Sequence, residues 1–260
     1  MTRRLWLCLI AAVLGAQPDR DAQWSAFLAW LRARPPDSKP ANLIHPYRAE
    51  LIRKGMSPAE ADHEMDRLGH LAFTRPDGAK VLWNKVYGGR DAIFVETPNA
   101  LLASAILDRK PGKALDFGMG QGRNTVFLAT QGWDVTGFDP SEEGVRLAQA
   151  GAAKAGVKIH AVAASDDQFD FGVAQWDLIA MTYVRSPTAH DAARIRRALA
   201  PGGIFVYENG SDRHNELLSC FSSFESCDSK IRTPSRTGIP PKKSAWNAWW
   251  RRSHRSNISS

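Results

Sequence analysis

The stretch from Lys113 to Asp139 constrains the fold more than any other part of the chain. It reads as a strand, a turn that contains Gly118, Gly120 and Gly122, a helix, and a second strand. Glycine has no side chain to block a ligand, so such a turn lets the backbone pass close to one. The pattern therefore predicts a parallel α/β unit with a small-molecule site over the turn.

Two acids and the glycine spacing indicate what this site binds. Asp139 ends the second strand, where a carboxylate can accept hydrogen bonds from a ribose diol. A dinucleotide fingerprint needs its third glycine one position later, where the chain has Arg123. Asp116, at the tip of the first strand, is a poor neighbour for a pyrophosphate. A ligand with a ribose and a cationic end fits better, and S-adenosylmethionine is such a ligand. A nicotinamide-dependent oxidoreductase is the alternative, and Arg123 counts against it.

Strands and helices alternate regularly over residues 80–218. Further strands are expected at 157–163, 176–184 and 204–208, separated by segments with helix signals. This order predicts an α/β fold with a doubly wound, mostly parallel Rossmann-like sheet.

A helical extension is expected at residues 21–75, before the α/β domain. Its first helix shows an apolar stripe of one helical face, and the stripe consists of Trp24, Phe27, Leu28 and Leu31. A later helix begins at Ser57, with Pro58 at its first position and Glu60 completing a capping box. Such stripes favour packing against the main domain, and a lid over a substrate pocket is the alternative.

Residues 1–16 have the composition of a secretory signal peptide. Arg3 and Arg4 precede an apolar run that ends in small residues near Ala16. The run is too short to span a bilayer comfortably, so no stable membrane span is expected. A cleaved leader predicts a secreted or periplasmic protein. The alternative is an uncleaved apolar leader on a cytoplasmic protein.

The positive charge of the chain is concentrated near its end. Residues 229–260 carry eight Lys or Arg and no Asp or Glu, whereas the whole chain has a net charge of +7, which leaves −1 for the rest. We therefore expect no specific nucleic-acid partner for the folded domain. Residues 219–260 are predicted to form a basic, disordered tail. The alternative is that this tail binds nucleic acid or a membrane surface.

The ordered motifs resemble those of the class I S-adenosylmethionine-dependent methyltransferases. Asp116-Phe-Gly-Met-Gly-Gln-Gly-Arg-Asn124 is similar to the first motif of that family, D-L-G-C-G-x-G-R-N in one branch. Asp139 matches the acid that holds the ribose hydroxyls. The segments 176–179 and 199–203 match the fourth strand and the turn before the fifth. The resemblance covers roughly residues 80–218 and implies a methyltransferase with S-adenosylmethionine as its cofactor.

The resemblance also implies a set of site residues. The segments 83–87 and 97–101 resemble those that precede the first motif in tellurite-resistance and thiopurine-type methyltransferases, where an aromatic pair helps to close the cofactor pocket. Asp166 would hold the adenine side. The implied cofactor-binding residues are Asp116, Gly118, Gly120, Gly122, Asn124, Asp139, Ser165, Asp166, Trp83 and Tyr87. The implied methyl acceptor is a small molecule or an anion.

The residues that act on the acceptor are not evident in the sequence. Tyr183 and His190 follow the fourth strand, where ligands of open α/β sheets gather, and are the candidates for the acceptor site. The three cysteines, Cys8, Cys220 and Cys227, do not form a zinc or disulfide pattern, so no metal site is expected.

One departure from the family pattern concerns the end of the sheet. The family fold has seven strands, and residues after Leu218 do not read as two further strands. The C-terminal strands are therefore expected to be missing. A second functional hypothesis follows: a protein that binds the cofactor but is catalytically impaired, with a truncated or frameshifted C-terminus. The sequence does not specify the oligomeric state.

Overall fold

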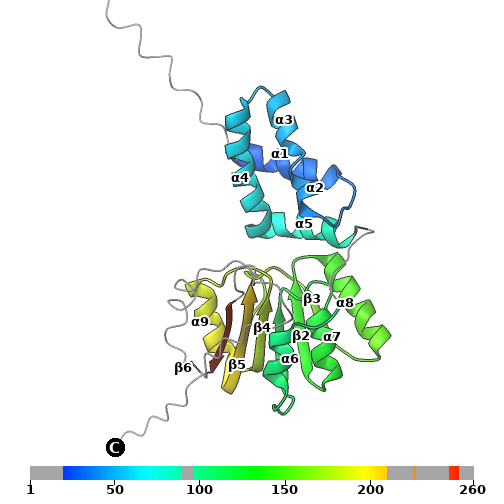
Figure 1. Ribbon diagram of the computed structural model, residues 1–260, viewed down its shortest axis with the longest axis vertical. Coiled ribbons are helices and arrows are strands. Elements are labelled where there is room, and N and C mark those ends of the chain that lie inside the picture. Colours follow the sequence, from blue (N-terminus) through cyan, green and yellow to red (C-terminus); the bar gives the residue numbers. More distant parts are fainter. Residues whose placement is uncertain (1–19, 90–95, 210–224, 227–245, 252–260) are drawn as a thin grey trace, which may run out of the picture.

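The computed structural model describes residues 20–89, 96–209, 225–226 and 246–251 of the chain. A helical unit lies above one edge of an α/β domain (Figure 1). The apolar leader expected at 1–16 and most of the tail expected at 219–260 lie outside the described residues. None of the described helices is long and apolar enough to cross a membrane.

The helical unit consists of five helices around one apolar core. They are α1 (Arg20–Ala33), α2 (Pro40–Ile44), α3 (Tyr47–Arg53), α4 (Pro58–Thr74) and α5 (Pro76–Tyr87). The whole predicted stripe of α1 is buried in this core. The capping box at the start of α4 is confirmed, because the Ser57 hydroxyl accepts from the Glu60 amide and the Glu60 carboxylate accepts from the Ser57 amide.

The helix α5 completes the helical unit and leads towards the α/β domain. The indole nitrogen of Trp24 donates a hydrogen bond to Asp77 over 2.9 Å, which ties α1 to the first turn of α5. Leu82 and Val86 are buried in the same core as α1 and α4. The domain boundary that the sequence suggested near residue 80 therefore falls inside α5.

The α/β domain is built on one seven-stranded sheet in the order β3-β2-β1-β4-β5-β7-β6. Its strands are β1 (Lys113–Phe117), β2 (Asp134–Asp139), β3 (His160–Ala163), β4 (Trp176–Thr182), β5 (Leu199–Asn209), β6 (Glu225–Ser226) and β7 (Trp246–Arg251). Strands β1 to β5 are mutually parallel. This confirms the predicted Rossmann-like α/β fold.

The expectation that the C-terminal strands are missing is wrong. The strand β7 pairs antiparallel with β5, from Ile204 opposite Arg251 to Asn209 opposite Trp246, and β6 pairs antiparallel with β7. The sequence hid both strands because β6 has two residues and β7 reads Trp-Asn-Ala-Trp-Trp-Arg, without an alternating pattern. The backbone groups at the outer edge of β5 are therefore paired.

Helices cover both faces of the parallel part of the sheet. They are α6 (Ala100–Ile106), α7 (Arg123–Thr130), α8 (Glu142–Ala155) and α9 (Ala189–Ala198). Alternate residues of β4 point to opposite sides: Ile179 and Met181 pack with α9, whereas Leu178 and Ala180 pack with α6 and α7. This alternation explains the continuous apolar run of β4, since a central parallel strand is buried on both faces.

The helical unit docks on the α/β domain through α5 and the first turn of α8. The side-chain oxygen of Asn84 accepts hydrogen bonds from the Ser141 hydroxyl (2.8 Å) and the Glu143 amide (3.0 Å). Lys80 adds an exposed ion pair to Glu142. Because Ser141 is the N-cap of α8, Asn84 holds α5 against a fixed point of the α/β domain.

We expect Asn84→Ala to lower the free energy of unfolding by about 1–3 kcal/mol, because two partly buried donors lose their acceptor. Urea denaturation followed by circular dichroism measures this change. Lys80→Ala is the control, and its effect should stay below about 1 kcal/mol, since both partners of its ion pair are exposed. Equal losses in the two variants would contradict the assignment of Asn84 as the main docking contact.

Candidate cofactor-binding site

A cavity lies where the helical unit meets the carboxyl ends of the parallel strands. From the helical unit it is lined by Phe73, Thr74, Pro76, Ala79, Trp83 and Tyr87. From the α/β domain it is lined by Phe117, Gly118, Phe138, Asp139, Pro140, Ser165, Asp166, Tyr183, Val184 and Arg185. Seven of the twelve residues predicted from the sequence for the cofactor and acceptor sites thus line one cavity, and they come from five separate segments.

The glycine turn is tightly packed as well as open to the cavity. Gly118, Gly120 and Gly122 have φ values of +66°, +55° and +85°, a region that side-chain-bearing residues rarely adopt. A Cβ on Gly118 would come within 2.6 Å of the Val184 side chain, and one on Gly120 would collide with the Tyr87 hydroxyl. Gly118 alone of the three lines the cavity. The other two glycines allow α5 and α8 to approach the turn.

Asp139 lies at the end of β2 with both carboxylate oxygens bound to backbone amides. One oxygen accepts from the Ser141 amide over 2.8 Å, and the other accepts from the Gly120 amide over 2.9 Å. Burial raises the pKa of Asp139 to about 6, although these two hydrogen bonds act in the opposite direction. The carboxylate lines the cavity and fixes the glycine turn at the same time.

Asp116 lies beneath the turn and does not line the cavity. Its carboxylate accepts a hydrogen bond from the Thr125 hydroxyl over 2.7 Å. Burial raises its pKa to about 6, against the opposing effects of Thr125 and the nearby charge of Arg123. Asp116 can therefore influence a ligand through the turn and through its charge, but the structure does not place it in direct reach of the cavity.

Asn124 is buried and connects three elements instead of lining the cavity. Its side-chain oxygen accepts from the Asn99 amide (2.9 Å), and its amide group donates to the Thr182 hydroxyl (2.8 Å). Asn99 in turn caps α6 and donates to Glu208. The segment 97–101, which the sequence placed before the first motif, is thus held against α7 and β4 by Asn124.

Trp83 and Tyr87 form the aromatic side of the cavity. Their ring centroids are 5.7 Å apart, and Phe73 packs edge-on against Trp83 at 6.1 Å. Burial raises the pKa of Tyr87. Phe73 is 45% exposed and was not singled out from the sequence. Its position in the last turn of an amphipathic helix gives no signal that it faces a ligand site.

The two acceptor-site candidates lie in different surroundings. Tyr183 lines the cavity with φ +56°, donates its hydroxyl to Glu208 over 2.9 Å, and has the Arg123 guanidinium over its ring. Burial and the hydrogen bond to Glu208 raise its pKa. His190 is exposed in the first turn of α9 and does not line the cavity. In the described part of the chain, no group of three or more His, Cys, Asp or Glu could hold a metal ion.

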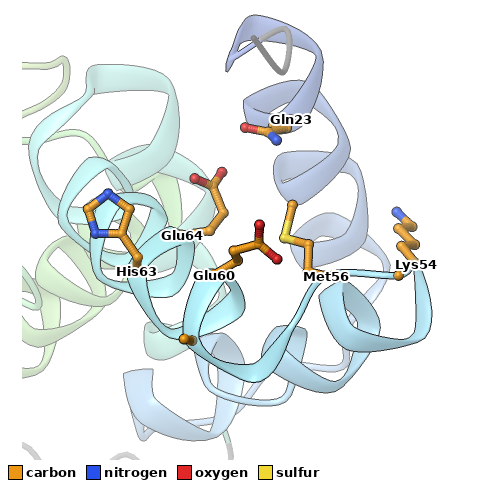
Figure 2. A pocket seen from close by; sticks show the side chains of 8 residues that line it. Gln23, Lys54, Met56, Glu60, His63 and Glu64 are labelled. Atoms are coloured by element: carbon orange, nitrogen blue, oxygen red, sulfur yellow. The ribbon is translucent and has the colours of Figure 1, made fainter. Parts of the chain in front are cut away.

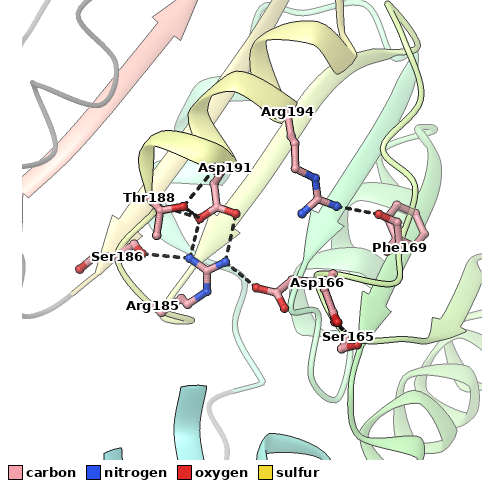
Figure 3. A network of polar contacts seen from close by, with 9 residues as sticks. Ser165, Asp166, Phe169, Arg185, Ser186, Thr188, Asp191 and Arg194 are labelled. Atoms are coloured by element: carbon pink, nitrogen blue, oxygen red, sulfur yellow. Dashed lines mark hydrogen bonds and ion pairs between the residues drawn. The ribbon is translucent and has the colours of Figure 1, made fainter. Parts of the chain in front are cut away.

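The loops after β3 and β4 are joined at the cavity by Arg185 (Figure 3). Arg185 forms ion pairs with Asp166 and with the buried Asp191. Ser165 lies beside Asp166 with its hydroxyl within hydrogen-bond distance of Gln168. The sequence analysis missed Arg185, because its partners are 6 and 19 residues away and no local pattern connects them.

A second hollow lies on the helical unit, away from the predicted site residues (Figure 2). Its acids are already engaged: Glu60 accepts from the Ser57 amide, and Glu64 forms an ion pair with Arg67. The two carboxylates of this hollow therefore already have partners and are poorly placed to bind a ligand. The cavity at the glycine turn is the better candidate.

Comparison with known families finds a match inside the α/β domain. Residues 114–203 match the family model described as a methyltransferase domain. Over these residues the chain is similar to a methyltransferase domain. The match runs from β1 to the turn inside β5, so it spans the glycine turn, Asp139 and the whole loop after β4. Among curated proteins, no match to the chain is found.

Several solved structures are similar to this chain at low sequence identity. One, from work on the conversion of a disulfide bond into a thioacetal group during echinomycin biosynthesis, is 20% identical, with a TM-score of 0.48 over 62% of this chain and 84% of that one. TehB from Haemophilus influenzae is 19% identical, with a TM-score of 0.46 over 67% of each chain. An S-adenosylmethionine-dependent methyltransferase from Thiobacillus denitrificans, in complex with S-adenosyl-L-homocysteine, is 23% identical, with a TM-score of 0.38 over 46% of this chain and 52% of that one. Similarity at this level does not transfer a substrate.

The cavity suits S-adenosylmethionine, the cofactor that the sequence motifs predict. The carboxylate of Asp139 lines the cavity beside Pro140, which offers apolar surface to a flat base. Gly118 leaves the backbone of the turn uncovered at the same wall. A nucleoside with a cationic end therefore meets a carboxylate, apolar rings and bare backbone in one place.

The raised pKa of Asp116 predicts a dependence of stability on pH. Between about pH 4 and 6 the folded state retains a proton that the unfolded state has released, so the free energy of unfolding falls as pH rises. Asp116→Asn removes this decrease, because asparagine does not titrate. We therefore expect the difference in the free energy of unfolding, variant minus wild type, to be about 2 kcal/mol more positive at pH 7 than at pH 4.

Urea denaturation at the two pH values tests this expectation. Asp134→Asn, at the exposed start of β2, is the control and should show little difference between them. The same relative stability of Asp116→Asn at both pH values would show that Asp116 titrates normally.

Proposed function

We propose that the protein transfers a methyl group from S-adenosylmethionine to a small, uncharged organic acceptor. One observation carries the proposal: a single cavity joins the bare turn at Gly118, the carboxylate of Asp139 and the aromatic wall of α4 and α5. The first two features suit the cofactor, and the third offers apolar surface for a second molecule. The helical unit thus contributes six of the sixteen residues that line the cavity, and this supports the alternative that it acts as a lid.

Each wall residue has a distinct part in holding the cofactor. Asp139 would accept hydrogen bonds from the ribose hydroxyls with the lone pairs that Gly120 and Ser141 do not use. Asp166 would accept from the adenine side. Asp116 would favour the cationic end through its buried charge. Trp83 and Tyr87 would cover the site from the helical unit and exclude water from it.

Methyl transfer requires alignment more than proton chemistry. When bound, S-adenosylmethionine supplies a sulfonium-activated methyl group that is open to in-line attack. The chain has to hold the acceptor on that line and keep water out. Tyr183 lines the cavity and donates its hydroxyl hydrogen bond to Glu208, so its phenolic oxygen can accept a hydrogen bond from the attacking group. We place the acceptor next to Tyr183, and His190 has no part in this arrangement.

The charges around the cavity favour an uncharged acceptor over an oxyanion. Among the described residues that line the cavity, Arg185 is the single basic side chain. Its charge is opposed by Asp166 and by the buried Asp191. Among the lining residues, an anionic acceptor would therefore meet no unopposed positive charge, whereas Phe73 and Trp83 offer apolar surface to an organic molecule.

The paired edge of β5 also bears on the hypothesis of a catalytically impaired protein. That hypothesis arose because the C-terminal strands were expected to be missing, and β7 occupies their place. We therefore favour an active enzyme. A secreted or periplasmic location, which depends on residues 1–16, remains a proposal, and fractionation of cells that express the full chain tests it.

We expect Asp139→Ala to weaken the binding of S-adenosylmethionine at least tenfold, because the ribose loses its acceptor. Isothermal titration calorimetry measures the affinity, and thermal unfolding checks that the variant is folded. Asp139→Asn keeps one oxygen for the amides and should show an intermediate loss. Asp134→Ala is the control at the other end of β2. Unchanged affinity in the folded Asp139 variants would remove the basis for this cofactor site.

We expect uncharged aromatic probes to be methylated faster than oxyanions. The assay follows labelled methyl transfer to catechol and phenol, compared with tellurite and selenite at equal concentration, and the expected difference in initial rate is at least tenfold. Phe73→Ala should lower kcat/KM for the best aromatic probe about tenfold, whereas His70→Ala, on the exposed side of α4, should not. Preferential turnover of the oxyanions would overturn the proposed acceptor class.

A further inference from the structure

We propose that Arg185 is a positioning residue that holds the Asp166 carboxylate in place to recognise the amino group of the cofactor's adenine. The proposal rests on the proposed function, since it concerns how the same cavity distinguishes an adenine from other bases. It assigns a role to an arginine that touches neither the glycine turn nor the ribose carboxylate. Its basis is the polar network between the loops after β3 and β4 (Figure 3).

Arg185 is anchored on the side away from the cavity by a buried carboxylate. Its two terminal nitrogens donate to the two oxygens of Asp191, over 2.6 and 3.0 Å, in the bidentate geometry that fixes an arginine most firmly. Asp191 also accepts from the amide and the hydroxyl of Thr188, each over 2.8 Å. The Asp191 side chain is 2% exposed, so this anchor belongs to the rigid start of α9.

The hydrogen bonds to Asp191 also favour its ionised form. Burial on its own would raise the pKa of Asp191, but the hydrogen bonds from Arg185 and Thr188 outweigh it and hold this pKa below the usual value. The same carboxylate partners keep the pKa of Arg185 above its usual value, despite burial. The pair is thus ionised across the pH range in which the protein would work.

The other side of Arg185 reaches Asp166. The Nη2 atom of Arg185, which donates to Asp191, also donates to one oxygen of Asp166. The guanidinium carbon of Arg185 lies 5.5 Å from the centre of the Phe117 ring. Asp166 lines the cavity. Its second oxygen makes no hydrogen bond to another described residue. One oxygen is therefore fixed and the other is left to face a ligand.

This arrangement gives the cavity a preference that can be measured. A carboxylate oxygen only accepts hydrogen bonds, so it can receive one from the exocyclic amine of adenine but repels the carbonyl oxygen of hypoxanthine. The preference depends on a fixed carboxylate, because a mobile side chain could turn away from the wrong base. Arg185 supplies that fixation through its link to α9.

The test compares the binding of two probes, S-adenosyl-L-homocysteine and S-inosyl-L-homocysteine, by isothermal titration calorimetry. We expect the wild-type full chain to bind the adenosyl probe at least tenfold more tightly. Arg185→Met should reduce this ratio to about threefold or less, and Arg185→Lys, which keeps the charge but loses the fork, should lie between them. Asp166→Asn should bring the ratio near one or invert it, because an amide can donate to the hypoxanthine carbonyl.

Arg194→Met is the matched control. Arg194 also braces the loop after β3, through the Phe169 carbonyl (2.7 Å) and the Phe171 ring (4.1 Å), but it does not contact Asp166. Its loss should leave the ratio unchanged, even if both affinities fall. Thermal unfolding checks every variant, and Arg185→Lys serves if Arg185→Met does not fold.

Two results separate the failure of this proposal from the failure of the proposed function. If the wild type binds the adenosyl probe but Arg185→Met and Arg185→Lys weaken both probes equally, Arg185 has a structural role alone and the proposal is overturned. If the wild type binds the two probes equally, Asp166 does not read the base, and the proposal falls while the cofactor site stands. If the wild type binds neither probe, the proposed function fails and this proposal fails with it.

Discussion

The buried carboxylate of Asp139 is the interaction on which the arrangement of the site depends. It accepts one hydrogen bond from the glycine turn, at Gly120, and one from the start of α8, at Ser141. A buried amide without an acceptor is costly, so these two bonds hold the end of β2, the turn and α8 in one geometry. The residue that suits the ribose is therefore also the residue that shapes the surface beside it, and the two roles cannot be separated by mutation of Asp139 alone.

The helical unit is positioned by contacts with the same two residues, Ser141 and Gly120. Ser141 caps α8 and donates its hydroxyl to Asn84 of α5, while Tyr87, one turn further along α5, packs so closely on Gly120 that a Cβ there would collide with it. These contacts fix the position of the aromatic wall relative to the glycine turn that it covers. A change in the turn should be transmitted to the cover, since Tyr87 contacts the turn directly.

The sequence predicted the parts of the site that depend on local pattern. The glycine turn and Asp139 follow from spacing within one βαβ unit, and the sheet follows from alternation of strands and helices. Asn124 was assigned to the cofactor by resemblance, but the structure buries it between Asn99 and Thr182, a contact between distant segments. Arg185 was missed for the same reason. The strand β7 was missed because its position in the sheet comes from pairing with β5, and its own sequence does not alternate.

The order of the strands has a consequence for how the chain is made. The outer neighbour of β5 is β7, at residues 246–251, and the whole parallel part of the sheet precedes it in the chain. During synthesis from the N-terminus, β5 emerges from the ribosome well before the strand that covers it. A nascent chain halted in that interval displays an apolar, unpaired edge of the kind that recruits other strands. The interval between the synthesis of β5 and that of β7 is therefore the stage at which this edge is exposed.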